Sequence, residues 1–275
     1  MTPFVKMHGL GNDFVVLDLR GGLAAPGADA ARLIADRRRG IGCDQLILIE
    51  PPEMAGADVR LRFLNSDGSE SGACGNGTRC VASRLMAETG ADRLVIQTLA
   101  GRLEAAPAPG GLFTVDMGAA HLDWRDIPLA EECDTLHLPI ASGPLEDPAA
   151  VNMGNPHCVF FVEDAEDIEL AVFGPQIEHH PLFPERTNVE VATVIDRGRI
   201  RLRVWERGAG ITLACGSGAC ATAVAAVRRG LADRRVELIM DGGSLTAEWR
   251  DGGHVLLTGP VATSFTGMLE DYRAA

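Results

Sequence analysis

One stretch of this chain occurs twice: Arg60-Leu-Arg-Phe-Leu-Asn-Ser-Asp-Gly-Ser-Glu-Ser-Gly-Ala-Cys-Gly-Asn-Gly77 and, 141 residues later, Arg201-Leu-Arg-Val-Trp-Glu-Arg-Gly-Ala-Gly-Ile-Thr-Leu-Ala-Cys-Gly-Ser-Gly218. Seven of the 18 aligned positions are identical, and no gap is needed. Gly and Ala are common in this chain, but a gapless match that ends both times in Ala-Cys-Gly-x-Gly is improbable by chance. We infer an internal duplication whose period is that of a domain, not of a solenoid repeat.

The repeat extends on both sides of the quoted stretch, with an offset of 141 downstream and 143 upstream. Further matched pairs are Gly11-Asn12 with Gly154-Asn155, Gln45 with Asn188, Val95 with Val236, and Gly118 with Gly259. We therefore expect two similar domains, residues 1–117 and 118–261. Residues 262–275 have no counterpart in the first half, and we expect them to return and pack on the first domain.

Hydrophobic periodicity gives each half the same order of elements. Short apolar or alternating runs such as 14–17, 45–49 and 59–63 predict strands. A small-residue run behind each Gly-rich loop predicts a helix, over 78–89 and 219–229. Further helices are expected over 28–38 and 167–174, and a loop over 138–148. The sequence thus predicts an α+β fold with two domains, each a mixed or antiparallel, barrel-like sheet around a central helix, and an active site in the cleft between them.

Composition excludes several classes of function. The 275 residues are 46% hydrophobic and 23% charged, which is typical of a globular protein, and the formal net charge is −13. So negative a chain repels nucleic acid and anionic membrane surfaces. No stretch approaches the roughly 20 apolar residues of a membrane-spanning helix, and the N-terminal residues do not resemble a signal peptide. We therefore expect a cytoplasmic protein.

The seven cysteines fall into two groups. None forms a Cys-x-x-Cys pair, and their spacing does not match the usual zinc sites. Two of them, Cys74 and Cys215, occupy equivalent positions of the repeat. The other five are expected to be small packed side chains: Cys43, Cys80, Cys133, Cys158 and Cys220.

Each repeated cysteine is expected at a strand-to-helix junction, directly before Gly-Asn-Gly (75–77) or Gly-Ser-Gly (216–218). Backbone N–H groups in the first turn of a helix lack intrahelical partners and carry positive dipole character. Such a nest can hold a substrate carboxylate, and it can also stabilise a thiolate. A single copy would be explained by a glycine-rich helix cap, but two copies at matched positions favour chemistry.

Two thiols that approach one ligand from opposite sides suit a particular reaction. One group removes a proton and the other returns a proton to the opposite face, as in a two-base racemase or epimerase. A thiolate and a thiol fit these roles because they interchange by moving one proton.

The chain resembles the diaminopimelate epimerase family over essentially its whole length. The resemblance rests on eight motifs: Gly9-Leu-Gly-Asn-Asp-Phe14, Gly40-Ile-Gly-Cys-Asp-Gln45, Phe63-Leu-Asn-Ser-Asp-Gly68, Gly72-Ala-Cys-Gly-Asn-Gly-Thr-Arg79, Gly154-Asn-Pro-His157, Thr187-Asn188, Trp205-Glu-Arg-Gly208 and Ala214-Cys-Gly-Ser-Gly218. It implies epimerisation of LL-diaminopimelate to the meso form, in lysine and peptidoglycan precursor synthesis, without pyridoxal phosphate, metal or any other cofactor, by a homodimer.

The resemblance also implies residue roles. Cys74 and Cys215 would be the acid/base pair, and His157 and Glu206 would modulate their pKa values. The amides of Gly75-Asn76 and Gly216-Ser217 would hold the carboxylate at the reacting carbon. Side chains that line the substrate site would be Asn12, Gln45, Asn65, Asn155, Asn188, Glu206 and Arg207.

The repeat supports these assignments independently, because the implied ligands fall into matched pairs: Asn12 with Asn155, Gln45 with Asn188, Asn65 with Glu206, and Asn76 with Ser217. Amide side chains both donate and accept, which suits a zwitterion, and Arg207 can clasp a carboxylate. The α-proton of an amino acid is much less acidic than a thiol. We expect closure of the domains to exclude water, and the helix N-terminal amides to stabilise the developing negative charge.

Three alternatives remain at the level of sequence. A related racemase could act on proline or hydroxyproline, although a cyclic substrate has no distal amino acid for Arg207 to hold. A thiol-redox protein could cycle Cys74 and Cys215 through a disulfide, and two thiols facing one small cleft would be prone to oxidation. An amino-acid-binding protein could bind diaminopimelate without exchanging its α-proton.

Overall fold

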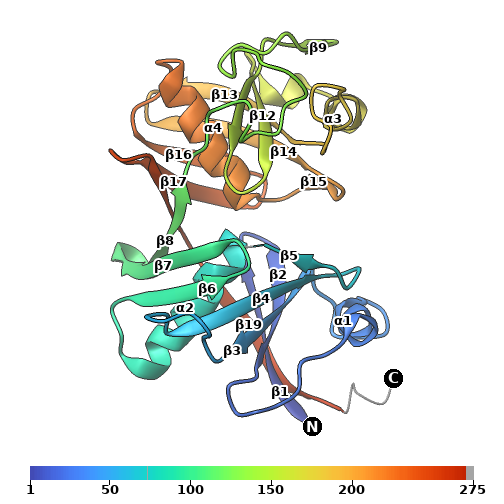
Figure 1. The fold of residues 1–275 in the computed structure, drawn as a ribbon, viewed down its shortest axis with the longest axis vertical. Helices are drawn as coiled ribbons and strands as arrows, with labels where there is room; N and C mark the ends of the chain where they lie inside the picture. Colours follow the sequence, from blue (N-terminus) through green and yellow to red (C-terminus); the bar gives the residue numbers. More distant parts are fainter. Residues whose placement is uncertain (73, 271–275) are drawn as a thin grey trace. The chain divides into compact units, whose positions relative to one another are not determined.

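The computed structural model describes residues 1–72 and 74–270, which form two compact units (Figure 1). Unit 1 contains Met1–Val115 and the chain from Gly259 onward, and unit 2 contains Asp116–Thr258. Each unit is an α+β structure with a mixed sheet, as the sequence predicts.

Unit 1 is built from strands around one long helix, with a shorter helix outside. Its elements are β1 (Thr2–Gly9), β2 (Asn12–Asp18), α1 (Ala28–Ala35), β3 (Gln45–Glu50), β4 (Val59–Asn65), β5 (Glu70–Ser71), α2 (Gly75–Thr89), β6 (Leu94–Thr98), β7 (Gly101–Ala108), the 3-10 turn η1 (Pro109–Gly111), β8 (Leu112–Ala119), which runs on into unit 2, and β19 (Ala262–Leu269).

Unit 2 has the same plan. Its elements are β9 (Ala141–Ser142), β10 (Leu145–Glu146), β11 (Ala149–Asn152), β12 (Pro156–Phe161), the 3-10 turn η2 (Ala165–Asp167), α3 (Leu170–Glu178), β13 (Asn188–Asp196), β14 (Arg199–Glu206), β15 (Gly210–Thr212), α4 (Gly216–Arg228), β16 (Arg235–Met240), β17 (Gly243–Trp249) and β18 (His254–Gly259).

Strand pairing confirms the duplication at the level of register. β2 pairs parallel to β3 with Phe14 opposite Gln45, and β12 pairs parallel to β13 with His157 opposite Asn188. Both positions are shifted by the upstream repeat offset. The antiparallel partner follows in each unit, β4 beside β3 and β14 beside β13. The two halves of the sequence therefore build the same ladder.

In each unit a central helix and an outer helix pack on strands of the same sheet. α2 contacts β1, β2 and β7, while α1 contacts β3 and β4. α4 contacts β11, β12, β13, β16 and β17, while α3 contacts β13 and β14. β3 and β13 are consequently buried on both faces over most of their length.

The last described strand returns to the first. β19 runs antiparallel to β1, with Thr2 opposite Leu269 and His8 opposite Ala262, and Figure 1 shows the two strands side by side in unit 1. This pairing accounts for residues 262–269, whereas 271–275 of the expected returning segment lie outside the described residues.

Four local expectations differ from the structure. The helix expected over 28–38 ends at Ala35, with Asp36 as its C-cap. The segment expected to be loop, 138–148, contains the short hairpin of β9 and β10. The helix expected over 167–174 is displaced to α3, since Ala165–Asp167 forms a 3-10 turn capped by the Asp164 carboxylate. The helices expected to begin at 78 and 219 begin three residues earlier, because each cysteine is itself the N-cap.

Within the described part of the chain, no helix combines the length and apolar character needed to cross a membrane.

Candidate active site

In unit 1, Cys74 caps the N-terminus of α2. Its backbone is extended (φ −145°, ψ 110°), and its Sγ accepts a hydrogen bond from the Gly77 amide at 3.4 Å. The first intrahelical bond joins Thr78 N–H to the Cys74 carbonyl, so the amides of Gly75 and Asn76 precede the regular ladder. An anion-binding nest at these amides stays a prediction. Ala73 of the motif lies outside the described residues.

The turn between β1 and β2 places Asn12 beside this thiol. Leu10 and Gly11 both have positive φ (56° and 84°), which is the geometry of a tight hairpin turn. Asn12 then directs Oδ1 toward Cys74 Sγ at 3.8 Å and toward Asn76 Nδ2 at 3.3 Å. The structure thus brings three of the expected site residues into one hydrogen-bonded group.

A charged network holds Asn12 in this orientation. Asn12 Nδ2 donates to Asp44 Oδ2 at 2.9 Å, and Asp44 Oδ1 accepts a hydrogen bond from Arg37 Nη2 at 2.8 Å. The Asp13 carboxylate accepts hydrogen bonds from Arg37 Nη2 at 2.7 Å and from Lys6 Nζ at 2.5 Å. Burial alone would raise the pKa of Asp13, but the bonds from Arg37 and Lys6 outweigh it and hold that pKa well below its ordinary value. The network therefore keeps Asp13 ionised at neutral pH.

Gln45 and Asn65 face each other across the β3–β4 ladder. Gln45 Nε2 donates to Asn65 Oδ1 at 2.9 Å, and Asn65 Nδ2 donates to Ser69 Oγ at 3.0 Å. The Gln45 Oε1 atom is buried without a hydrogen-bond partner. The pair is therefore fixed and retains an open acceptor, as a polar substrate site requires.

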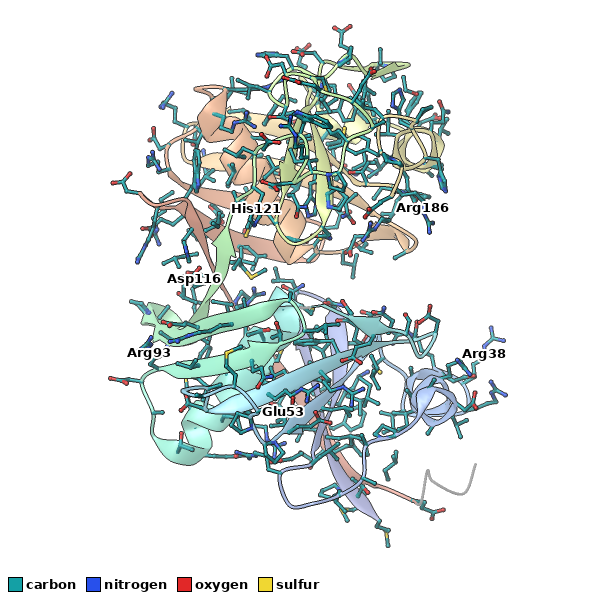
Figure 2. All side chains as sticks on the ribbon, viewed as in Figure 1. Arg38, Glu53, Arg93, Asp116, His121 and Arg186 are labelled. Atoms are coloured by element: carbon teal, nitrogen blue, oxygen red, sulfur yellow. The ribbon has the colours of Figure 1, made fainter. Side chains whose placement is uncertain are left out.

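A buried arginine also lies on the Cys74 side. Arg38 and Arg93 project from the surface of unit 1 (Figure 2), whereas Arg79, one turn into α2, is fully buried. Arg79 Nη2 donates to Asn76 Oδ1 at 2.6 Å. The guanidinium thus orients a residue of the helix N-terminus from within the protein.

In unit 2, Cys215 caps α4 in the same way. Its backbone is extended (φ −120°, ψ 115°), its Sγ accepts from the Gly218 amide at 3.4 Å, and Ser217 Oγ lies 3.5 Å from the sulfur. Burial, followed by the nearby carboxylates of Glu206 and Glu190, raises the pKa of the Cys215 thiol well above its ordinary value. These surroundings therefore favour the protonated thiol at Cys215.

Beneath this thiol lies a fully buried histidine–glutamate pair. His157 Nδ1 is 2.7 Å from Glu190 Oε1, and His157 Nε2 is 3.0 Å from Asn155 Oδ1. Both members of the pair have no exposed side-chain surface. Burial raises the pKa of Glu190, and the interaction with His157 opposes that rise in part.

The remaining expected residues of unit 2 gather at the ends of β13 and β14. Asn188 Nδ2 donates to the Pro156 carbonyl at 2.8 Å, and its Oδ1 accepts the Arg207 amide at 2.9 Å. Glu206 accepts from Thr212 at 2.6 Å and from the Cys215 thiol, and burial raises its pKa. The Arg207 guanidinium donates to the Glu185 carbonyl.

The other cysteines behave largely as expected. Cys43, Cys80, Cys158 and Cys220 are buried, and burial raises the pKa of Cys43 to about 11 and of Cys80 to about 12. Cys133 differs, because it is only half-buried at the margin of the unit 2 core. Within 1–72 and 74–270, His, Cys, Asp and Glu side chains form no group of three or more that could hold a metal ion.

Comparison with known proteins identifies the family. A family model described as diaminopimelate epimerase matches residues 4–122 and 149–264. The chain belongs to the diaminopimelate epimerase family. The diaminopimelate epimerase of Acidiphilium cryptum is 60% identical over 98% of this chain and 96% of its own length. The diaminopimelate epimerase of Rhodospirillum centenum is 58% identical over 98% and 92%.

Two solved structures share the fold of this chain. A hydroxyproline epimerase from Agrobacterium vitis, with bound trans-4-hydroxy-L-proline, matches with a TM-score of 0.71 at 16% identity, over 97% of this chain and 91% of that one. A phenazine biosynthesis protein of Bacillus anthracis matches with a TM-score of 0.69 at 14% identity, over 97% and 98%. At such identities the likeness to this diaminopimelate epimerase family member concerns the fold alone.

The main residue that sequence reasoning missed is Glu190. It lies in the run Asn188-Val-Glu-Val-Ala192, where a charge on an alternating strand indicates a solvent-facing side chain. One signal was available: the upstream offset aligns Glu190 with Ile47 and His157 with Phe14. A charged pair at two positions that are apolar in the other half is a departure from the repeat.

Proposed function

We propose that this chain epimerises LL-diaminopimelate to meso-diaminopimelate, with Cys74 and Cys215 as the two bases. The observation that carries the proposal is the repeated cap: in each unit a cysteine begins the central helix, with its sulfur 3.4 Å from an amide of the first turn. Family membership supplies the substrate. The geometry supports a reaction in which either sulfur can carry the proton.

The amides at each helix N-terminus have a second role in this proposal. Those of Gly75-Asn76 and Gly216-Ser217 bind the carboxylate attached to the reacting carbon, where negative charge grows as the α-proton leaves. Because they are already oriented by the helix, no reorganisation accompanies the reaction. The resemblance implies no cofactor, and these dipoles are the groups of this chain that would stabilise the carbanion.

The side chains around the caps bind the rest of the substrate. Amide groups that both donate and accept would hold the distal amino acid: Asn12, Gln45, Asn65, Asn155 and Asn188. Arg207 would exchange its bond with the Glu185 carbonyl for a bidentate pair with the distal carboxylate. His157 and Glu206 modulate the thiols, Glu206 by direct contact with Cys215.

The proton moves between sulfurs through the substrate. With LL-diaminopimelate bound, a thiolate at one cysteine takes the α-proton, and the thiol at the other delivers its own proton to the opposite face. The enzyme then holds the complementary protonation state, which suits the reverse direction. Each turnover conserves one proton on the pair.

The test separates inversion from exchange. Cys74→Ala and Cys215→Ala are each expected to lower epimerisation by at least about 10²-fold. In D₂O each variant should still exchange the α-proton of one configuration slowly and with retention, and the favoured configuration should be opposite in the two variants. NMR of both epimers measures this. Cys133→Ala, at a half-buried cysteine outside the caps, is the control.

Several outcomes would contradict the proposal. A wild-type rate of epimerisation in either cysteine variant would rule out the two-thiol mechanism. Exchange of proline or hydroxyproline without exchange of diaminopimelate would move the chain to the related racemases, whose fold it shares. Binding of diaminopimelate without any exchange would indicate a binding protein. A disulfide between Cys74 and Cys215 that cycles during turnover would indicate redox chemistry.

We also propose, on the strength of the family resemblance, that the protein acts as a homodimer in the cytoplasm. Light scattering at working concentration tests the dimer, and a monomer with full activity would contradict it.

A further inference from the structure

The two helix caps share a backbone but differ in what lies behind them. A Cβ placed on Gly77 would meet Ile47 Cδ1 at 2.7 Å, Phe63 Cε1 at 3.0 Å and Phe14 Cε1 at 3.4 Å. A Cβ placed on Gly218 would instead meet Glu190 Oε1 at 2.7 Å and Cys215 Sγ at 3.4 Å. The floor is therefore hydrocarbon in unit 1 and a carboxylate in unit 2.

The carboxylate of Glu190 is held in place from one side only. Its Oε1 binds His157 Nδ1, whereas its Oε2 is buried without a hydrogen-bond partner. A fully buried charge with a single partner is costly, and apolar residues of similar volume would stabilise the unit better. The other half of the repeat uses such residues at both positions, so the fold itself does not require the pair.

We infer that Glu190 is a positioning residue of the reaction: it orients the His157 ring toward Asn155, and its charge adds to the burial and the Glu206 carboxylate that disfavour a thiolate at Cys215. Its role in turnover rests on the proposed function, but the effect on the thiol does not. The assignment extends the set of site residues that the motifs imply, which contains His157 but not its partner.

Both halves of the inference follow from contacts. His157 Nε2 faces Asn155 Oδ1 only while Nδ1 is bonded to Glu190, because one bond fixes the ring for the other. Glu190 and the Cys215 sulfur flank the same glycine, so an anion at Glu190 opposes an anion at Cys215. The ionisable groups that face this sulfur are Glu190 on β13 and Glu206 on β14, with His157 on β12 behind them.

The experiment measures each thiol separately. Iodoacetamide alkylation is followed against pH in the full-length protein, and peptides with Cys74 and Cys215 are quantified by mass spectrometry. Glu190→Gln is expected to lower the pH midpoint for Cys215 by about one unit, as removal of a nearby like charge does, and to leave that for Cys74 unchanged. Glu190→Asp retains the charge, so its Cys215 midpoint should lie closer to that of the wild type than to that of Glu190→Gln.

The matched control is Glu166→Gln, the same change at an exposed carboxylate of unit 2 that pairs with Arg201. It should move neither midpoint. An unchanged Cys215 midpoint in folded Glu190→Gln would overturn the inference, and so would an equal shift at Cys74.

If Glu190→Gln does not fold, the wild-type protein decides. The inference requires a higher midpoint for Cys215 than for Cys74, and equal or reversed midpoints overturn it. Alkylation needs no substrate, so a wild-type protein that failed to exchange diaminopimelate would contradict the proposed function while this measurement still stood. In an active enzyme, Glu190→Gln should also displace the pH–rate profile, which a merely structural role would not.

Discussion

The N-terminal turns of α2 and α4 show how duplicated halves diverge. Both begin at a cysteine with extended backbone, and both bind that sulfur through an amide three residues later. On the unit 1 side a buried arginine and an ordered amide adjoin the cap. On the unit 2 side, buried carboxylates adjoin it. The same backbone thus begins one helix beside a buried arginine that binds Asn76, and the other with a thiol near anions.

This difference bears on the proposed reaction, which needs one thiolate and one thiol. Two identical caps would compete equally for the single proton of the pair. The surroundings of Cys215 favour the protonated thiol, and they make the two copies unequal without any change of backbone. Duplication supplies matched geometry, and substitution at a few buried positions makes the two copies different in charge.

The largest effect is expected from filling the floor of each cap. Gly77 and Gly218 lie in the first helical turn at φ values open to alanine, so the cost comes from packing alone. Gly77→Ala presses on the flexible end of Ile47 and should cost about 1–3 kcal/mol in the free energy of unfolding, with activity largely retained. Gly218→Ala displaces Glu190, and should also lower kcat by about 10²-fold.

Urea unfolding and the exchange assay measure the two quantities side by side. Equal losses of kcat in the two variants would show that the carboxylate floor of unit 2 has no special role. A Gly218→Ala variant with wild-type kcat would contradict the comparison directly.

A smaller effect is expected from loosening the unit 1 cap. In Asp44→Asn, Asn12 loses the charged acceptor that fixes its amide, so Oδ1 faces Cys74 for less of the time. The loss of one such hydrogen bond corresponds to about a 3- to 10-fold lower kcat, with a changed alkylation rate at Cys74 only. Asp29→Asn, at an exposed ion pair of α1, is the control. An equal change in the alkylation rate of Cys215 would contradict the view that the Asp44 network acts on the unit 1 cap alone.

Much of this arrangement could be predicted from sequence because it is local. The repeat predicts the ladder, since register follows from residue spacing, and Ala-Cys-Gly-x-Gly predicts a cysteine at a helix start. The helices begin three residues before 78 and 219 for a physical reason: glycine has a poor helix propensity, but each cysteine sulfur caps one first-turn amide, that of Gly77 or of Gly218.

Glu190 could not be predicted in the same way, because its burial depends on three layers. Val189 and Val191 face the core cluster beneath α3, so alternation turns Glu190 to the opposite face. In a sheet with one solvated face that position would be exposed. Here α4 covers it, and only the tertiary packing of α4 on β13 converts a surface charge into a buried one.

The two units should respond to acid in opposite directions. Asp13 in unit 1 has a folded pKa below its ordinary value of 3.8, so its contribution to stability is present above that value and is lost as pH falls through the folded pKa. Glu190 and Glu206 in unit 2 have folded pKa values above 4.5. As pH rises through those values, ionisation of the two buried carboxyl groups lowers the free energy of unfolding. As pH falls, protonation of both groups restores that free energy.

The smallest expected effect follows from these signs. Between neutral pH and about pH 4.5, Glu190 and Glu206 should add to the resistance of unit 2 to urea, while His180, whose pKa is lowered by burial, contributes in the opposite direction. Below about pH 4, unit 1 should lose resistance to urea because of Asp13. All three tryptophans lie in unit 2, so their fluorescence reports that unit, and hydrogen exchange of β2 and β3 peptides reports unit 1. Asp13→Asn should flatten the acid loss of unit 1, whereas Glu190→Gln should flatten the gain of unit 2. Parallel acid profiles in the two units would mean that the buried carboxylates of the two caps do not differ in the way their contacts indicate.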